Sequence, residues 1–386
     1  MTTRQTGSQR VVIIGGGIAG LATAARLAQS GLPVTLCEAS ELGSAASTRN
    51  QGWLHSGGLF APDSIDYARV CHTALQETLR FCPDCLEPQI PSMVYLFSRA
   101  DTLVKTWTDA WTAAGIHYEN VPVEQVAASL EGIDRERIQH AFRLPDRAIR
   151  ADVLVAHLAA TAQNAGVEIR TGTVVKRLVC QGDRVQGVET GTGEHIAAQL
   201  VILAGGSMGF ALCTEYLRQK PGDQPDFELV PLRTHLAALR PEVGRLPFCI
   251  VDAEGFNHIP HPPASVFGLA DWERLSAPDD HPVSQQVEQL RSKVTEFFPG
   301  QAADTRSLRS WAGTMIQSMT IDQIEPGTAI WPAVIDHGRY RPHMANLVSV
   351  FSGRATLWSK LADDARRLVL AKLDVAAPET AHPPWT

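Results

Sequence analysis

Three glycines near the start of the sequence, Gly15, Gly17 and Gly20, have the spacing Gly-x-Gly-x-x-Gly. They follow the apolar run Val11–Ile14 and open a segment with helical periodicity. In such a unit the first glycine makes a tight turn, the second lets the backbone approach a pyrophosphate, and the third lets helix and strand pack closely. This spacing predicts a dinucleotide site at the N-terminus of a helix.

An acidic residue supports the same prediction. The predicted helix begins at Ile18, and its first residues, Ile18 and Ala19, point their free N–H groups and the positive dipole end toward the pyrophosphate. The next predicted strand ends at Glu38, just before Ala39. A carboxylate there can accept hydrogen bonds from both ribose hydroxyls and would repel the 2′-phosphate of NADP. A glycine turn that merely packs is the alternative, and it leaves Glu38 unexplained.

Residues 39–62 form a glycine-rich segment with neither helical nor strand periodicity. A loop of this length inside a compact domain is more often functional than idle. It contains His55, whose imidazole can exchange a proton near neutral pH. His55 is therefore the first candidate for a catalytic group, with a loop-shaping hydrogen bond as the alternative. Trp53 is the tryptophan placed to pack beside a cofactor.

Hydrophobic periodicity predicts the elements that hold these groups. The predicted helices cover residues 18–30, 64–81, 101–114, 153–165 (capped by Asp152), 283–297 and 356–373. The predicted strands cover residues 10–14, 33–38, 93–97, 167–171, 173–180, 184–190, 199–203 and 347–351, and residues 225–318 are mostly β. The first strands and helix form a βαβ unit, and the α/β pattern resumes near residue 150.

Bulk properties favour a small-molecule partner. The 386 residues carry a net charge of −7 and no dense Lys/Arg block, which disfavours nucleic acid and an anionic membrane as partners. No apolar run is long enough to span a bilayer, so a cytoplasmic location without an integral membrane segment is expected. The seven scattered cysteines are typical of free thiols.

Two short motifs have spacing that is reminiscent of metal ligands. Cys82 and Cys85 form a CxxC pair, but no second pair follows. His258 and His261 lie three residues apart on a predicted strand, whose alternation would point them to opposite faces. We interpret the first as a pair at a helix end and the second as plain strand-end residues, and expect no metal.

Two later segments resemble the FAD-dependent oxidoreductases of the D-amino acid oxidase superfamily. Gly172–Val175 leads into a β-hairpin, and Leu200–Leu203 leads into Ala204, Gly205 and Gly206. In that superfamily a strand residue near Val175 meets the adenine, and the Ala-Gly-Gly turn lies near the pyrophosphate. The resemblance therefore implies non-covalently bound FAD rather than NAD.

The loop carries the resemblance further. It looks like the segment that runs along the flavin, and its His-x-Gly motif is similar to the glycine/D-amino acid oxidase, 2-hydroxyglutarate oxidase and glycerol-3-phosphate dehydrogenase branches. The residues implied to line the cofactor here are Ser47, Thr48, Arg49, Asn50, Gln51 and Gly52. In some relatives a histidine near such a loop is joined covalently to the flavin.

The C-terminal turn departs from the family pattern. The usual Gly-His-Gly-like turn over the flavin reads Gly353, Arg354, Ala355 and Thr356 here. The position still suits a turn at a helix N-terminus near the pyrimidine ring, where Arg354 could stabilise negative charge on the reduced ring. Substrates of the superfamily commonly carry a carboxylate, so a binding arginine is expected. The candidates are Arg233, Arg309 and Arg354, and a surface or capping arginine is the alternative for each.

The resemblance implies a Rossmann-like, doubly wound α/β FAD-binding domain and an interleaved α+β substrate domain on a mostly antiparallel sheet. We predict the FAD-binding domain at residues 1–62, 151–224 and 321–386, and the substrate-binding domain at residues 63–150 and 225–320.

The predicted function is oxidation of an amine, amino acid or 2-hydroxy acid by hydride transfer to FAD, with reoxidation by oxygen or an electron carrier. The substrate is a small molecule that carries an amine or a carboxylate. One alternative is a flavin monooxygenase or halogenase, but its usual mid-chain Asp-Gly pair is absent and the Gly-Asp pairs lie too early. Another is a flavin-binding protein without independent turnover.

Overall fold

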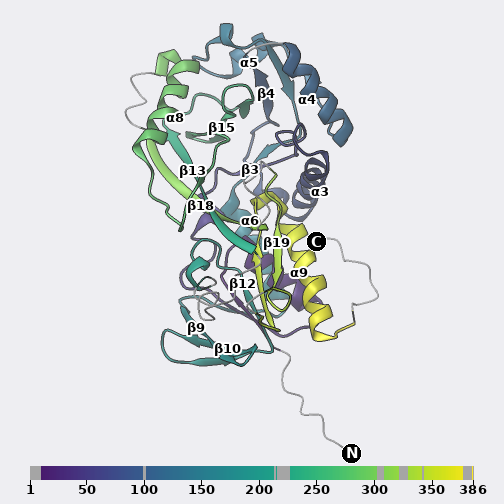
Figure 1. Ribbon diagram of the computed structural model, residues 1–386. Coiled ribbons are helices and arrows are strands. Elements are labelled where there is room, and N and C mark those ends of the chain that lie inside the picture. The colour runs from purple at the N-terminus through teal and green to yellow at the C-terminus, as the bar shows by residue number, and fades with distance from the viewer. Residues whose placement is uncertain are drawn as a thin grey trace, which may run out of the picture.

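The protein has two regions, each built on its own large sheet (Figure 1). The computed structural model describes residues 10–98, 101–212, 214, 227–301, 308–320, 329–340, 343–376 and 385. Within this part of the chain, no helix has the length and apolar character required to cross a bilayer. The long strands β13 (Phe227–Leu239) and β18 (Arg309–Thr320) pair with each other between the two regions.

The first region, which we call the cofactor region, is a six-stranded sheet. Its strands, in spatial order, are β19 (Ala333–Asp336), β20 (Leu347–Phe351), β12 (Leu200–Leu203), β1 (Val11–Ile14), β2 (Val34–Cys37) and β8 (Glu168–Arg170). All neighbours are parallel except β19, which is antiparallel to β20 at the edge. The central strands are apolar on both faces because both faces are covered.

Different layers cover those faces. The helices α1 (Ile18–Gln29), α6 (Ala151–Asn164) and α9 (Trp358–Leu373) pack on one side, where Val11 and Ile13 point. Val12 points to the other side. There a three-stranded antiparallel sheet is formed by β9 (Val175–Gln181), β10 (Arg184–Thr190) and β11 (His195–Ala197). Because successive side chains of a strand point to opposite faces, β1 is buried in the helical layer on one side and against the three-stranded sheet on the other.

The second region, the substrate region, is built on a nine-stranded, mostly antiparallel sheet. Its other strands are β4 (Val94–Phe97), β5 (Glu119–Asn120), β6 (His140–Arg143), β14 (Phe248–Ile250), β15 (Phe256–His261), β16 (Ala264–Gly268) and β17 (Glu273–Arg274). Only β4 and β14 pair in parallel. The helices are α3 (Ile65–Phe81), α4 (Asp101–Ala114), α5 (Val123–Ser129) and α8 (Ser284–Phe297).

The predicted fold class agrees with this architecture, and most predicted elements lie within two residues of the observed ones. One detail was wrong: α6 begins at Ala151 after Arg150, so Asp152 lies in the first turn and is not the cap. The loop at residues 39–62 contains the short helix α2 (Ala46–Arg49) and the two-residue strand β3 (Trp53–Leu54). β3 pairs with β7 (Arg147–Ala148), a strand that the sequence did not indicate. The exact domain boundaries stay a prediction.

Candidate functional site

Backbone contacts explain two of the three glycines of the turn. Gly15 has φ +114°, and a Cβ there would lie 2.6 Å from the carbonyl oxygen of Ala204. A Cβ on Gly20 would lie 1.9 Å from the carbonyl oxygen of Gly15, so helix α1 can approach β1 only at a glycine. The Ala204 N–H donates to Ile14. The turn after β12, with Gly205, therefore lies directly against the turn after β1.

The N-terminus of α1 faces the loop. The hydroxyl of Ser47 accepts a 3.0 Å hydrogen bond from the Ile18 N–H, and a Cβ on Gly17 would lie 2.8 Å from the same oxygen. Asn50 shapes the turn, since its amide donates to the Ser47 carbonyl and its side-chain oxygen accepts from the Gly52 N–H. The Thr48 hydroxyl donates to the Gly43 carbonyl. This arrangement leaves a small, polar cradle at a positive helix end.

Glu38 lies over the glycine turn. Its carboxylate accepts hydrogen bonds from the Gly16 N–H (2.7 Å) and the Ser40 N–H (2.8 Å). The Glu38 carbonyl accepts from Thr173, which brings the segment leading to Val175 alongside. These bonds fix the carboxylate at the end of β2, where ribose hydroxyls would meet it. Gly16, which the sequence motif did not single out, also fits closely, because a Cβ there would lie 2.6 Å from the Leu42 side chain.

His55 is buried in the same loop, beyond β3. Its ring lies 4.3 Å from the Trp53 ring and 5.0 Å from the Phe60 ring, measured between centroids. Its backbone N–H donates to the hydroxyl of Thr356 at 3.1 Å. Burial, together with the positive charge of Arg354, holds the pKa of His55 well below its usual value. The imidazole is therefore neutral and able to accept a proton.

Arg354 joins this cluster from the C-terminal turn. Its guanidinium carbon lies 4.4 Å from the Phe60 ring centroid and 5.6 Å from that of Trp272. Gly353 precedes it at φ +64°, and a Cβ there would lie 2.5 Å from the Ile330 carbonyl oxygen. That same carbonyl accepts the Tyr67 hydroxyl. The turn therefore places a cation beside Phe60, whose ring also lies beside the neutral imidazole of His55.

The other two candidate arginines lie elsewhere. Arg233 is buried, and its guanidinium is already bonded to Glu273 (2.8 Å), Asp279 (2.7 Å) and the His281 carbonyl. Arg309 is exposed on β18 opposite Ala238. Of the three arginines, Arg354 is the one that lies in the same cluster as His55 and Phe60.

Two of the remaining predicted cofactor residues contact the substrate region. The Gln51 amide donates to the Val266 carbonyl, and the exposed Arg49 lies 3.9 Å from Asp280. The others lie along the turns already described or at their edges: Ala19, Ala39, Gly206 and Ala355.

Asp146 is the residue of this site that the sequence did not reveal. It is fully buried and accepts hydrogen bonds from the Trp53 indole (2.8 Å) and the Tyr95 hydroxyl (3.1 Å). The Ser56 hydroxyl is bonded to its other oxygen. About ninety positions separate Asp146 from the loop, and no motif links them, so only the β3–β7 pairing could have shown the contact.

His258 and His261 lie on β15, and each is hydrogen-bonded to protein groups. His258 is buried between the Leu246 carbonyl and the Ser265 hydroxyl, and burial lowers its pKa to about 3. His261 bonds Glu87 and the Gln51 carbonyl, so it also holds the loop. Among the described residues, no group of three or more His, Cys, Asp and Glu side chains converges as metal ligands would. Cys82 and Cys85 are both buried free thiols.

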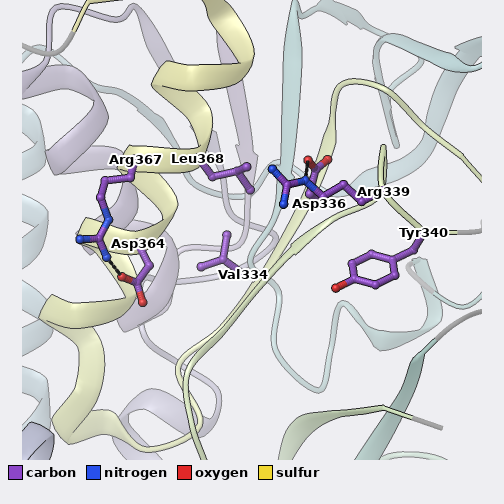
Figure 2. Close-up of a pocket in the computed structure, with 7 residues that line it drawn as sticks. All are labelled: Val334, Asp336, Arg339, Tyr340, Asp364, Arg367 and Leu368. Carbon is purple, nitrogen blue, oxygen red and sulfur yellow. Dashed lines mark hydrogen bonds and ion pairs between the residues drawn. The ribbon is translucent and has the colours of Figure 1, made fainter.

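A pocket of about 370 Å³ lies on the cofactor region, between β19 and α9 (Figure 2). Its charges are already paired, Arg367 with Asp364 and Arg339 with Asp336. None of the predicted site residues lines it. We therefore place the site at the loop and not at this pocket.

The family model described as FAD dependent oxidoreductase matches residues 10–335. The chain belongs to this family. Its FAD-dependent oxidoreductase class and its cofactor, FAD, are those that the sequence predicted.

Individual relatives are similar over most of the chain. The anaerobic glycerol-3-phosphate dehydrogenase subunit A1 of Haloferax volcanii is 27% identical over 96% of this chain, which spans only 65% of that relative's length. The glycine oxidase of Pseudomonas aeruginosa is 28% identical over 79% of this chain and 82% of its own. The dithionite-reduced L-α-glycerophosphate oxidase of Mycoplasma pneumoniae with FAD bound superposes with a TM-score of 0.71 at 18% identity, covering 97% of both chains. That likeness shows the shared fold.

The residues present fit FAD. A Cβ on Gly15 would meet the backbone of Ala204, and one on Gly17 would meet the Ser47 hydroxyl, so only glycines keep the backbone this close at the first turn of α1. That turn offers its N–H groups to a pyrophosphate. Glu38 offers a fixed carboxylate for the ribose.

Proposed function

We propose that this chain oxidises a small anionic substrate that carries a hydroxyl on the reacting carbon, such as a 2-hydroxy acid or a hydroxyl-bearing phosphate ester. One observation carries the proposal: a neutral, buried His55 and the cation Arg354 both lie beside the ring of Phe60 in the loop at residues 39–62. The glycines, Ser47 and Glu38 would hold the cofactor. FAD, when bound, supplies the acceptor for the two electrons that leave the substrate.

Each side chain has a role in this proposal. Arg354 binds the anionic group and thereby fixes which substrate carbon reaches the ring. His55 accepts the hydroxyl proton, which its depressed pKa permits because the imidazole is unprotonated at neutral pH. Phe60 packs beside both groups and limits the access of water to them, and Trp272 covers Arg354 further.

A hydroxyl is favoured over an amine for two physical reasons. A hydroxyl gives up its proton only to a base, which His55 provides, whereas a neutral amine already has a lone pair. In addition, an ammonium group would be repelled by Arg354. An amino acid is the second candidate, since the chain is 28% identical to a glycine oxidase. Glycerol 3-phosphate belongs to the first class, and the name of the Haloferax relative supports it.

The test is anaerobic bleaching of the bound flavin by glycerol 3-phosphate, lactate, 2-hydroxyglutarate and glycine. We expect a hydroxyl compound to bleach it faster than glycine does, and His55→Gln to slow that bleaching about 10²-fold or more. The matched control is His117→Gln, which changes an exposed histidine. Bleaching by glycine alone would support the second candidate, and bleaching by none would indicate flavin binding without independent turnover.

A further inference from the structure

Asp146 bonds two residues of the loop on either side of His55 in sequence, Trp53 and Ser56. Its Oδ1 accepts from the Trp53 indole at 2.8 Å, and its Oδ2 is bonded to Ser56. Tyr95, from the centre of β4, donates to Oδ1 at 3.1 Å. The carboxyl group has no exposed surface. A buried carboxyl with three side-chain partners fixes the positions of the groups around it, and here those groups flank His55.

The His55 ring has an unused nitrogen on the Asp146 side. Its Nδ1 lies 4.0 Å from Asp146 Oδ1 and makes no hydrogen bond within the described part of the chain. His55 is only 7% exposed, so water does not readily replace the missing partner. Because Oδ1 already accepts two hydrogen bonds, its contact with His55 is one of charge. Burial raises the pKa of Asp146, and the hydrogen bonds from Ser56, Trp53 and Tyr95 oppose that rise by stabilising the ionised form. The negative charge of this form favours the proton on Nδ1 over Nε2.

We propose that Asp146 is the positioning residue for His55. Its carboxylate keeps the ring proton on Nδ1, which leaves the lone pair of Nε2 for the substrate hydroxyl. When that proton moves from the hydroxyl oxygen to Nε2, the ring becomes an imidazolium, and the Asp146 charge stabilises it against the repulsion from Arg354. This inference rests on the proposed function, in which Nε2 is the proton acceptor.

The variant Asp146→Asn isolates the charge. The Asn side-chain oxygen can still accept from Trp53 and Tyr95, and its amide can donate to the Ser56 hydroxyl, so the local hydrogen bonds are kept. Asp252→Asn is the matched control. Asp252 likewise accepts hydrogen bonds from a backbone N–H and a hydroxyl, those of Ser98, and it lies past the far end of β4.

The first readout is the tautomer of His55 in FAD-loaded protein labelled with ¹⁵N-histidine, with the ring signals assigned by their loss in His55→Gln. We expect the Nδ1–H form in wild type and in Asp252→Asn, and a shift toward the Nε2–H form in Asp146→Asn. An Nε2–H form in wild type, or the same tautomer with and without the Asp146 charge, would overturn the proposal. The wild-type result decides the question even if Asp146→Asn fails to fold.

The second readout is the rate of anaerobic flavin bleaching by whichever hydroxyl compound bleaches wild type. Asp146→Asn is expected to lower it about 10²-fold, with the FAD dissociation constant changed by less than about threefold and Asp252→Asn unchanged. An unchanged rate in Asp146→Asn would overturn the proposal. If no compound bleaches wild type, the proposed function fails, while the tautomer still tests Asp146 separately.

Discussion

The glycine turn and the His55 loop, which we propose to form one site, obtain their geometry in different ways. At the turn, backbone meets backbone: Gly15 lies against Ala204, and Gly20 lies against Gly15. At the loop, side chains from distant parts of the chain make the contacts: Asp146 accepts from the Trp53 indole, and the Thr356 hydroxyl accepts from the His55 backbone N–H. The first kind of site leaves a sequence motif and the second does not.

The largest effect is expected at the turn. Gly15→Ala adds a Cβ against the Ala204 carbonyl at a positive φ, and Gly31→Ala adds one at φ +84° with nothing within 4 Å. Both carry the backbone strain, of about 1 kcal/mol, but only the first meets the neighbouring turn. We expect Gly15→Ala to lose FAD on purification, with a flavin-to-protein absorbance ratio near zero, and Gly31→Ala to keep it. If both variants retained FAD equally, close backbone approach would not be what makes this site.

The second largest effect is expected at Arg354. Replacing it with Met removes the cation beside Phe60 but keeps an apolar side chain of similar length. The rate of flavin reduction at low concentrations of an anionic hydroxyl substrate is expected to fall about 10²-fold, because a charge-assisted bond of about 2–3 kcal/mol is lost. Stopped-flow bleaching under nitrogen measures it. A loss of the same size in Arg309→Met, which changes an exposed arginine, would count against the assignment.

Arg233 is the contrasting case to Arg354, because it is paired with two carboxylates and is expected to affect stability instead of substrate binding. Arg233→Met leaves Glu273 and Asp279 without their partner, and these carboxylates are 42% and 45% exposed. Solvent screening reduces the cost, so the free energy of unfolding is expected to fall by about 1–2 kcal/mol. Urea titration measures this change. Arg274→Met, which breaks an exposed pair with Glu228, should cost less than about 1 kcal/mol. A normal stability but abolished reduction of the flavin by substrate in Arg233→Met would return Arg233 to the substrate site.

The contacts that could be predicted from the sequence are the local ones, and those that could not are the long-range side-chain contacts. The βαβ unit, Glu38 and the C-terminal turn were predictable, because their hydrophobic period and turn residues are local. Arg233 was a reasonable candidate by residue type, but its partners on the segment 273–281 are forty or more positions away. Asp146 had no signal at all, since its role depends on the two-residue pairing of β3 with β7. Long-range side-chain pairing needs the fold first.

The last comparison concerns buried histidines, one in each region, which leave stability at neutral pH unchanged. Burial lowers the pKa of His258 to about 3 and that of His337 to about 4. In the unfolded chain each titrates near 6.5, so above that pH neither affects stability. As the pH falls below it, the unfolded state binds protons that the folded state excludes, and stability drops by about 1.4 kcal/mol per pH unit for each histidine.

Urea midpoints between pH 7 and pH 5 measure this slope. His258→Asn and His337→Asn should each flatten it by a similar amount, although they lie in different regions. The exposed His117→Asn should leave the slope unchanged. A slope that stays the same in both buried variants would mean that neither histidine is neutral in the folded protein.

The most direct test of the site is a crystal structure of the FAD-loaded protein. It should show the pyrophosphate against Gly15–Gly20 and Ser47, and the isoalloxazine ring in contact, at about 4 Å, with the loop that carries His55 and with the turn that carries Arg354. A flavin ring placed away from both residues, with His55 and Arg354 still clustered around Phe60, would contradict the account.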